Sequence, residues 1–383
     1  MKKIYLNNAA TSYPKPLSVL TSVNEYLSNP PFHSARAGFE NANADITSEC
    51  RNRIAKIFNV KDQNRVIFTS GSTESLNLAL FGSDFTDAHI ITSNTEHNSV
   101  LRPLKTLERE KRISLSILPS DSCGFVSPDD IEKEINSKTS AIVVNHASNV
   151  TGRIQDLKSI SDIAIKYNLK LIVDASQSAG TIDIDFFNLK IDLLAFTGHK
   201  SLFGLQGIGG LLIREGIYLK PIKVGGTGIR SEYLYQPETL PLYYEAGTPN
   251  MPGIVSLNEG CKYIEKTGIN YINKQKKELI RLIKDNIKEL PGVRVLDSSV
   301  NSNNLSILNL IFDDFEPEDA GYILEQSFGI IVRAGLHCAP LIHTSLGSHP
   351  MGTVRISPSH FNTIEEIHYL IESVNKICLG RGF

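Results

Sequence analysis

The sequence lacks the features that would assign it to several special classes of protein. Its 39 basic and 41 acidic residues leave a formal net charge of −2, and it has no stripe of lysine and arginine with interleaved aromatics, so nothing favours a nucleic-acid partner. No apolar run is long enough to span a bilayer, and no apolar stretch follows the two lysines at the start, which argues against a signal peptide. We expect neither nucleic acid nor membrane as a partner.

Cysteine is scarce and scattered. The five cysteines lie far apart, at positions 50, 123, 261, 338 and 378, and none forms a C-x-x-C pair. An odd number at this spacing does not fit a disulfide framework. We therefore expect a reducing compartment and a cytoplasmic protein.

The sequence does contain short apolar runs that alternate with longer amphipathic stretches up to about residue 215. Continuous rather than alternating apolarity is typical of strands that are covered on both faces, and it predicts a largely parallel sheet between helices. Candidate strands are residues 65–70, 89–93, 114–119, 141–147, 170–176, 192–198 and 209–214, and candidate helices between them include residues 72–82 and 157–168.

A second domain is expected because 383 residues are too many for one ordinary core. The pattern breaks into proline and glycine over residues 237–253, and a charged helix is predicted beyond it at 270–290, ended by Pro291 and Gly292. Strand, helix, strand and helix patterns follow at residues 303–312, 316–329, 353–357 and 363–377. We predict a large domain over residues 16–254 and a smaller α+β domain made of residues 1–15 and 255–383.

Polar motifs directly follow several of the predicted strands. They are "TSGSTE" (69–74), "TEHNSV" (95–100), "NHASNVTG" (145–152), "VDASQSAG" (173–180) and "FTGHKS" (196–201). Ligands of open α/β sheets bind outside the carboxyl ends of the strands. The motifs therefore predict one composite site at that edge of the sheet.

The residue types in these motifs suit a pyridoxal phosphate cofactor. Asp174 at a strand end can hold a proton on a pyridine nitrogen, and Lys200 after another strand can form a Schiff base with an aldehyde. Ser72 and Thr73, at a predicted helix N-terminus, would offer hydroxyl and N–H groups to a phosphate, and His97 would stack on a ring or relay protons. Taken singly, each residue also has an ordinary structural interpretation, such as a helix cap or a buried ion pair.

The glycines do not form a nucleotide-binding motif. "GSTESL" is not G-x-G-x-x-G, "GLQGIGG" (204–210) precedes a strand and not a helix, and neither a Walker motif nor a G-x-S-x-G elbow occurs. We expect the glycines of residues 204–210 to let the chain pass close to its neighbours as it returns to the sheet.

Taken together, eight stretches resemble the fold type I pyridoxal-phosphate enzymes, within the class V aminotransferases, and most closely the type II cysteine desulfurase and selenocysteine lyase group. In the family's order they are "YLNNAAT", "FTSGSTESLNLAL", "TEHNSV", "NHASNVTG", "VDASQSAG", "GHKSLFGLQGIGGLLIR", "YEAGTPN" and "RAGLHCAPL", which run from residue 5 to beyond 340. The resemblance implies pyridoxal 5'-phosphate as cofactor and an α/β fold of the PLP-dependent transferase type I, with a mostly parallel seven-stranded sheet flanked by helices. It also implies a homodimer.

The resemblance implies roles for individual residues around the cofactor ring. Lys200 would be the Schiff-base lysine and proton shuttle. Asp174 would pair with the pyridinium nitrogen, Gln177 with the ring hydroxyl, and His97 would stack on the ring. The cofactor phosphate would be held by Ser72, Thr73, Thr197, His199 and, from the neighbouring subunit, Thr248.

Substrate binding and sulfur transfer are implied in the same way. Asn149 would lie beside the cofactor and the substrate carboxylate, which Arg355 would clamp bidentately. Cys338 would attack the sulfur of L-cysteine, carry it as a persulfide and leave alanine, and His337 or Arg333 would help to form its thiolate. Because only four residues separate Arg333 from Cys338, the tether is short and a protein sulfur acceptor would have to reach in.

Several alternatives stay open. Cys338 alone also fits a small core residue, and His337, Cys338, His343 and His349 contain ligand types for a metal, but their spacing matches no common zinc pattern, so no metal is expected. The substrate would be cysteine or selenocysteine. Another class V aminotransferase or lyase would not need Cys338, and a sulfur-delivery protein with little turnover of its own would keep the cofactor site. Residues 341–352 are peculiar to this chain, and neither the sulfur acceptor nor a pathway such as iron–sulfur cluster assembly is disclosed by the sequence.

Overall fold

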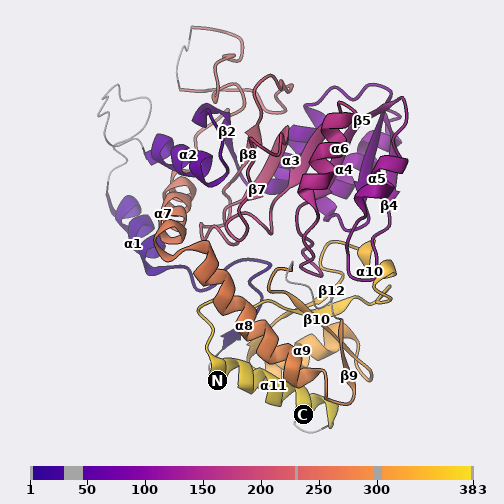
Figure 1. The fold of residues 1–383 in the computed structure, drawn as a ribbon. Coiled ribbons are helices and arrows are strands. Elements are labelled where there is room, and N and C mark those ends of the chain that lie inside the picture. Colours follow the sequence, from indigo (N-terminus) through magenta and orange to yellow (C-terminus); the bar gives the residue numbers. More distant parts are fainter. Residues whose placement is uncertain (1–2, 30–45, 229–231, 297–303, 381–383) are drawn as a thin grey trace.

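The larger part of the molecule is built on one central sheet (Figure 1). The computed structural model describes residues 3–29, 46–228, 232–296 and 304–380. β8 is antiparallel to β2 and β7, and the remaining neighbours are parallel, so the predicted mostly parallel seven-stranded sheet is confirmed. The order across the sheet is β2 (Val66–Thr69), β8 (Gly209–Ile213), β7 (Leu193–Thr197), β6 (Lys170–Asp174), β5 (Thr139–Asn145), β3 (Ala88–Ser93) and β4 (Ile113–Leu118).

Helices cover both faces of this sheet, which explains the unbroken apolar runs. Along β5, Ile142 and Val144 pack in one hydrophobic cluster, whereas Ala141 and Val143 pack in another on the opposite face. These four residues are thus buried although their side chains point to opposite faces. The first cluster includes side chains of α2 (Ile46–Ile57), α5 (Pro128–Lys133), α6 (Leu157–Lys166) and α7 (Met251–Thr267), and the second includes those of α3 (Ser72–Phe81) and α4 (Asn98–Arg109).

The smaller part has its own core around an antiparallel sheet of four strands. Their order is β12 (Arg333–Gly335), β13 (Thr353–Ile356), β10 (Leu308–Phe312) and β9 (Val293–Leu296). The core also receives side chains from α8 (Ile269–Ile287), α9 (Pro317–Phe328) and α11 (Ile364–Cys378), and from β1 (Ile4–Tyr5), which pairs with β11 (Ile330–Ile331). Both ends of the chain thus contribute to this part (Figure 1). The division at residues 254 and 255 stays a prediction.

Some helices carry little sequence signal. α1 (Leu17–Ser28) buries only Val19 and leaves Leu17, Leu20 and Leu27 exposed, so it shows no clear apolar stripe. α7 begins inside the proline- and glycine-rich stretch that we interpreted as a break. Pro252 lies in its first turn, where a missing N–H does no harm, and the side chain of Asn250 caps it by accepting from the Gly253 N–H at 3.1 Å.

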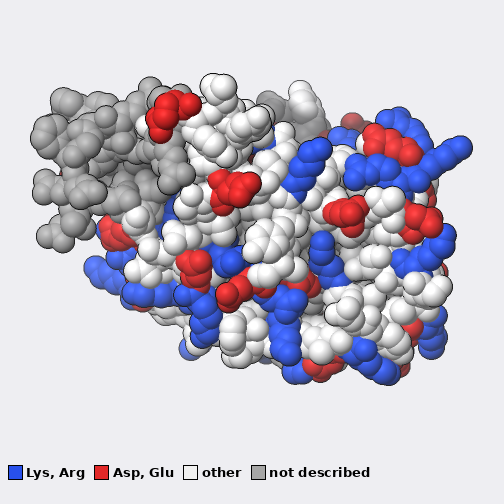
Figure 2. All heavy atoms as spheres, turned by 90° about the horizontal axis from the view of Figure 1, so that it is seen from above, with Lys and Arg blue, Asp and Glu red and all other residues white. Residues whose placement is uncertain are grey.

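The face of the molecule drawn in Figure 2 carries charges of both signs. On the face shown in Figure 2, basic and acidic side chains are interspersed and form no basic stripe. Among the described helices, none is long and apolar enough to cross a membrane.

Candidate active site

Three neighbouring strands end at the same edge of the central sheet and bring their following loops together. Asn145 at the end of β5 is in register with Asp174 at the end of β6, and Asp174 with Ala195 in β7. Asp174 is buried, with 4% of its surface exposed, and one of its oxygens accepts a hydrogen bond from the Ser176 N–H at 2.9 Å. The predicted meeting of the loops after these strands is therefore present in the structure.

Lys200 follows β7 and lies in the middle of the charged groups of this edge. Burial lowers the pKa of Lys200 to about 8, while the charge of Asp174 acts in the opposite direction. The side chains of Arg355, Arg333 and Cys338 also act on its amine. No hydrogen bond or ion pair of the Lys200 amine is found within the described residues. A desolvated lysine with a raised neutral fraction is suited to react with an aldehyde.

His97 is fixed by its own helix. It is the N-cap residue of α4, and its Nδ1 accepts a hydrogen bond from the Ser99 N–H at 3.0 Å. Nδ1 therefore carries no proton in this arrangement, and the other ring nitrogen, Nε2, carries it. Burial lowers the pKa of His97 to about 4, and the charges of Lys200 and Arg333 act in the same direction. At neutral pH the His97 ring is therefore uncharged.

The loop between β2 and α3 offers backbone donors. Gly71 is the N-cap of α3 and has φ +154°, a conformation reserved for glycine, and no side chain caps the helix there. The N-terminus of α3, with Ser72 and Thr73, is thus open to an anion. A Cβ on Gly71 would lie 3.7 Å from Oγ1 of Thr197 at the end of β7, so two predicted phosphate-binding segments are adjacent.

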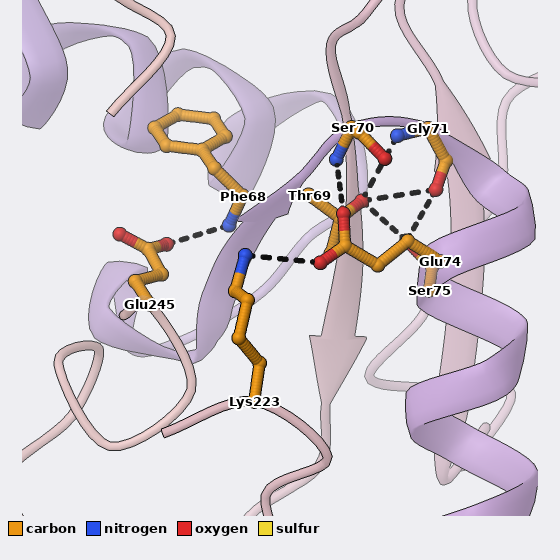
Figure 3. A network of polar contacts seen from close by, with 8 residues as sticks. All are labelled: Phe68, Thr69, Ser70, Gly71, Glu74, Ser75, Lys223 and Glu245. Atoms are coloured by element: carbon orange, nitrogen blue, oxygen red, sulfur yellow. Dashed lines mark hydrogen bonds and ion pairs between the residues drawn. The ribbon is translucent and has the colours of Figure 1, made fainter. Parts of the chain in front are cut away.

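A polar network holds this loop in shape (Figure 3). Oε2 of Glu74 accepts the Ser70 N–H at 2.7 Å, and its other oxygen accepts from the Lys223 amine at 3.1 Å. Oγ1 of Thr69 donates to the Gly71 carbonyl at 3.0 Å. Because Glu74 is turned back on the loop and neutralised by Lys223, its charge does not oppose an anion at the helix N-terminus.

The glycines after Lys200 allow close approach of the backbone, as we expected. A Cβ on Gly209 would lie 2.7 Å from Cα of Gly71, and one on Gly210 would lie 2.6 Å from the ring of Phe196. Contacts this short are closer than real Cβ atoms tolerate. β8 can therefore pass beside β7 and the loop between β2 and α3 only because these positions have no side chain.

Residues 9–15 of the N-terminal segment bond to the loops after β6 and β7. The His199 carbonyl accepts hydrogen bonds from the Ser12 N–H at 3.0 Å and the Lys15 amine at 2.9 Å, and the Gln177 amide donates to the Ala9 carbonyl at 3.0 Å. The His199 ring keeps its Nδ1 buried without a partner among the described residues. Burial lowers the pKa of His199 to about 4, so an uncharged ring is available for a further hydrogen bond.

Two guanidinium groups face the site from the smaller part. Arg333 of β12 and Arg355 of β13 are directly opposite each other in an antiparallel pair, so their side chains lie on one face of the sheet. Arg355 is 1% exposed, donates to the Asn149 carbonyl at 2.7 Å and keeps its Nε buried without a partner in the described chain. Burial lowers the pKa of Arg355 to about 9, and the charge of Arg333 acts in the same direction. Two opposed cations with no carboxylate bonded to either in the described part of the chain form a site for an anion.

Cys338 lies beside this pair. Its Sγ accepts a hydrogen bond from Nη2 of Arg333 at 3.0 Å, so a cation can stabilise negative charge on the sulfur. Cys338 (φ 60°) and His337 (φ 52°) are both in the left-handed region, which costs a residue other than glycine about 1–3 kcal/mol. Two bonds from the larger part hold them: the Asn98 N–H donates to the Cys338 carbonyl at 2.8 Å, and the Asn149 amide donates to the His337 carbonyl at 2.7 Å.

His337 has a different role from the one that its place beside the cysteine suggested. Its Nε2 is 2.8 Å from Oγ1 of Thr353, which donates to Oδ1 of Asn309 at 2.7 Å, and the Asn309 amide donates to the Val150 carbonyl at 2.7 Å. Burial lowers the pKa of His337 well below its usual value. Of the two residues that we considered as helpers of Cys338, Arg333 is the cation in contact with the sulfur, and His337 is neutral and ties the loop down.

The other residues around the cysteine belong to the packing between the two parts. Residues 341–352 include α10 (Ile342–Ser345), in which Ser345 accepts a hydrogen bond from the Asn94 amide at 2.8 Å. Nδ1 of His343 bonds to Ser348 at 2.7 Å. Within the described residues, no three histidine, cysteine or acidic side chains gather as a metal site would require.

Thr248 makes no bond to the other predicted site residues among the residues described. It is exposed on a bend just after Glu245, whose carboxylate accepts the Phe68 N–H at 2.6 Å near the loop between β2 and α3 (Figure 3). Sequence reasoning missed Asn7, whose Oδ1 accepts from Arg355 at 3.2 Å, and the opposed Arg333–Arg355 pair. Only the strand register could have disclosed that pair.

Comparison with known families agrees with this arrangement. The sequence model of the class-V aminotransferase family matches residues 4–370 of the chain. The chain therefore belongs to the class-V aminotransferase family, and the resemblance seen in the sequence is confirmed. Enzymes of this family depend on pyridoxal 5'-phosphate.

Individual relatives narrow the comparison to one activity. A probable cysteine desulfurase of Methanothermobacter thermautotrophicus is 31% identical, with 99% of this chain and 95% of that protein covered. One of Pyrococcus abyssi is 32% identical over 95% of this chain and 91% of the relative. The apo structure of a cysteine desulfurase from Thermococcus onnurineus superposes with a TM-score of 0.92 at 30% identity, covering 99% and 95% of the two chains.

The side chains present fit the cofactor of the family. The buried, unpartnered Nδ1 of His199 and the uncapped N-terminus of α3 are open to further polar contacts. The desolvated Lys200 amine is near Asp174, whose charge acts on it. An aldehyde-reactive lysine, an acid for a ring nitrogen and an anion cradle are the three features that pyridoxal phosphate needs.

Proposed function

We propose that this protein is a pyridoxal-phosphate-dependent cysteine desulfurase that converts L-cysteine to L-alanine and keeps the sulfur on Cys338 as a persulfide. The observation that carries the proposal is the position of Cys338. Its sulfur contacts the guanidinium of Arg333 at 3.0 Å and its charge acts on Lys200, so a nucleophile and the aldehyde-reactive lysine share one site.

The residues at the edge of the sheet would hold the cofactor. Lys200 would bind its aldehyde, Asp174 would hold a proton on the ring nitrogen, Gln177 would face the ring hydroxyl and His97 would stack on the ring. When bound, the cofactor supplies a sink for the electron pair that is left on substrate carbon. The phosphate would be held by Ser72, Thr73, Thr197 and His199, and by Thr248 of a second subunit.

The two opposed arginines would orient the substrate. A carboxylate between Arg355 and Arg333 would relieve the repulsion of the two cations, and Asn149 is held beside them by its bond to Arg355. The substrate would then be anchored at its carboxylate, with its thiol directed toward the Cys338 loop. This arrangement favours cysteine-sized amino acids, because the same arginine contacts both the anion site and the sulfur.

Sulfur transfer would follow from the charges on this side of the site. The Cys338 thiolate attacks the substrate sulfur, an S–S bond forms and the C–S bond breaks, with its electron pair left on the substrate side. Lys200 gives a proton to the carbon, which completes alanine, and the proton lost from Cys338 balances the one gained. Arg333 stabilises the thiolate before the attack, and a reductant or a protein acceptor later removes the persulfide sulfur.

The proposal is tested by incubation of the holoenzyme with L-cysteine. Alanine should form, and mass analysis should find one additional sulfur on the peptide that contains Cys338. Cys338→Ser should lower alanine formation by about two orders of magnitude or more, since a nucleophile is lost, without change in the cofactor absorbance. Cys123→Ser is the matched control and should behave as the wild type.

The outcomes of this test separate the alternatives. Alanine formed by Cys338→Ser at the wild-type rate would exclude Cys338 as the sulfur acceptor. Pyruvate or another keto acid without a persulfide would indicate a different class V reaction. Selenocysteine as a second substrate in the same assay measures the preference between sulfur and selenium.

We propose further that the enzyme works as a homodimer and passes its sulfur to a protein acceptor. Support for the dimer comes from exposed apolar side chains between β8 and Thr248, of which Tyr218 is 83% and Leu234 is 93% exposed. Support for an acceptor comes from the short tether of Cys338, which cannot carry the sulfur far. None of the five cysteines is in a disulfide, which suits a cytoplasmic location.

A further inference from the structure

A pocket lies at the junction of the two parts of the molecule, beside the site of Lys200 and Cys338. It encloses about 490 Å³, including space that is open to solvent. Segments far apart in the sequence line it: the loops after β6 and β7, the helix α8, residues 305–307, and residues 357–360 after β13. Neither Lys200, Cys338 nor Arg355 lines this pocket.

The pocket contains one cation without a counter-ion. Lys276 of α8 lines it one turn after the buried Ile272, so both side chains lie on the same face of the helix. No aspartate or glutamate is among the lining residues. Burial lowers the pKa of Lys276 to about 8, and no bond of its amine to another described residue is present. Lys276 is half-buried in this pocket, and an ammonium that is partly removed from water is stabilised most by an anion.

Unused polar groups surround this lysine. Ser306 is 6% exposed, and neither its hydroxyl nor that of Ser201 has a hydrogen-bond partner in the described part of the chain. The His360 ring is held through Nε2, which is 2.7 Å from the hydroxyl of Tyr263. Its Nδ1 is buried without a described partner. If the tyrosine hydroxyl donates to Nε2, then Nδ1 carries the ring proton and is a donor.

Two other hydroxyls in the same pocket, those of Ser357 and Ser12, already form hydrogen bonds within the protein. Oγ of Ser357 accepts the Ala9 N–H at 2.9 Å, and Oγ of Ser12 accepts from the Lys15 amine at 2.8 Å and is 3.1 Å from the His199 carbonyl. The groups left for a ligand are thus one ammonium, three hydroxyls (those of Ser201, Ser306 and Thr181) and one imidazole, all of them able to donate. A set of donors without an acidic acceptor fits an oxyanion.

We propose that this pocket binds a small oxyanion, a phosphate or carboxylate group, through Lys276, Ser201, Ser306 and His360. The ligand would contact both parts of the molecule, because Ser201 follows β7 of the large sheet and the other three residues belong to α8 and the segments around the smaller sheet. Gln177 also lines the pocket and donates to Ala9, so the bound anion would lie next to residues that border the cofactor site.

The test uses the holoenzyme, in which the cofactor already fills its own phosphate cradle. Thermal unfolding and isothermal titration calorimetry are measured with inorganic phosphate in one arm and acetate in the other, at constant ionic strength. The variants are Lys276→Gln and Ser306→Ala, and Lys274→Gln, an exposed lysine on the same helix, is the matched control. Binding at Arg333 and Arg355 is common to all variants and cancels in the comparison.

In the wild type, at least one of the two anions should raise the Tm in a saturable way. Lys276→Gln should weaken that binding by about tenfold or more, as the loss of a charged hydrogen bond predicts, and Ser306→Ala by a few-fold. Lys274→Gln should bind like the wild type. The arm that responds identifies the ligand as phosphate-like or carboxylate-like.

Two results would overturn the proposal. One is no Lys276-dependent binding of either anion at about 10 mM, tenfold above a Kd of 1 mM, which would mean that the pocket holds only water. The other is equal affinity in wild type, Lys276→Gln and Ser306→Ala. If Lys276→Gln fails to fold, the Ser306→Ala comparison decides alone. Because the readout is binding, the result does not depend on whether the enzyme is a desulfurase.

Discussion

Lys200 and Cys338 reach the same site from backbones of opposite kinds. Lys200 is carried in by β7, a strand in which every residue is buried and which lies between two other strands of the large sheet. Cys338 lies on a short loop of two consecutive left-handed residues, held by hydrogen bonds from Asn98 and Asn149 of the other part. The position of Lys200 is therefore set by the hydrophobic core of the large sheet. The position of Cys338 is set by a few hydrogen bonds to its own loop.

The difference suits the two roles that we propose. A group that holds a cofactor through every turnover benefits from a rigid strand, whose five buried residues resist displacement. A cysteine that must accept sulfur and then be reached by a protein acceptor benefits from a position on a loop between the two parts of the molecule. We therefore expect changes on the lysine side to abolish cofactor chemistry, and changes on the cysteine side to alter sulfur transfer while the cofactor stays bound.

The largest effect is expected on the lysine side. Lys200→Ala should remove the visible absorbance of the bound imine and abolish alanine formation, since the amine on which the charge of Asp174 acts is lost. Absorbance spectra and borohydride reduction followed by mass analysis check this. Lys220→Ala, an exposed lysine after β8, is the control and should keep both. A reducible linkage that survives in Lys200→Ala would mean that another lysine binds the cofactor.

A smaller effect is expected for Arg333→Gln on the cysteine side. The variant loses the charged hydrogen bond to Sγ of Cys338, and such bonds contribute about 1.5–3 kcal/mol, so alanine formation should fall roughly 10- to 150-fold. Iodoacetamide should alkylate Cys338 more slowly at pH 7, while Cys123 in the same sample reacts as before. Arg333→Lys should recover part of the rate. An unchanged alkylation rate would show that the guanidinium does not activate the sulfur.

The pKa of Lys200 predicts how the apoenzyme takes up its cofactor. A pKa of about 8 means that the neutral amine grows from about one tenth of the population at pH 7 to about nine tenths at pH 9. The rate of imine formation, followed by stopped-flow absorbance, should therefore rise about tenfold over this interval and then level off. A lysine with an ordinary pKa near 10.5 would continue to rise well above pH 9, and that result would contradict the lowered value.

The smallest effect on activity is expected for the residues that tie down the cysteine loop. Thr353→Val removes the hydroxyl between His337 and Asn309 and leaves buried polar groups unsatisfied, at a cost of about 1–3 kcal/mol in the free energy of unfolding. Denaturant unfolding measures this, with the exposed Thr344→Val as control. The cofactor absorbance should not change. A loss of absorbance in Thr353→Val would show that the two sides of the site are not separable.

The difference between the strand that carries Lys200 and the loop that carries Cys338 also explains how much of the site could be predicted from the sequence. "FTGHKS" is a local signal, because the strand and the loop that follows it are contiguous, and the same holds for Asp174 and for the strands of the sheet. Cys338 was predicted by its motif, but its left-handed backbone depends on Asn149, which is far away in the sequence. Local patterns cannot reveal such a contact.

The arginine pair shows the limit most clearly. Arg333 and Arg355 face each other because β12 and β13 pair in one register. Next to the pair, a Cβ on Gly352 would lie 2.2 Å from the carbonyl of Gly335, so the approach of the strands depends on these two glycines. Nothing in either segment alone specifies its partner. Likewise, α1 was missed because its leucines do not form a stripe that faces a core.

The first residues of the chain have a consequence for its biosynthesis. The Ala9 N–H bonds to Ser357, and Asn7 bonds to Arg355, so each contact spans 348 residues. On the ribosome, the strands of the large sheet can pair while the N-terminal segment still waits for partners that are made near the end of translation. The bonds of Asn7 and Ala9 can therefore form only after the strands of the large sheet have been made, and the surroundings of Arg355 are completed last.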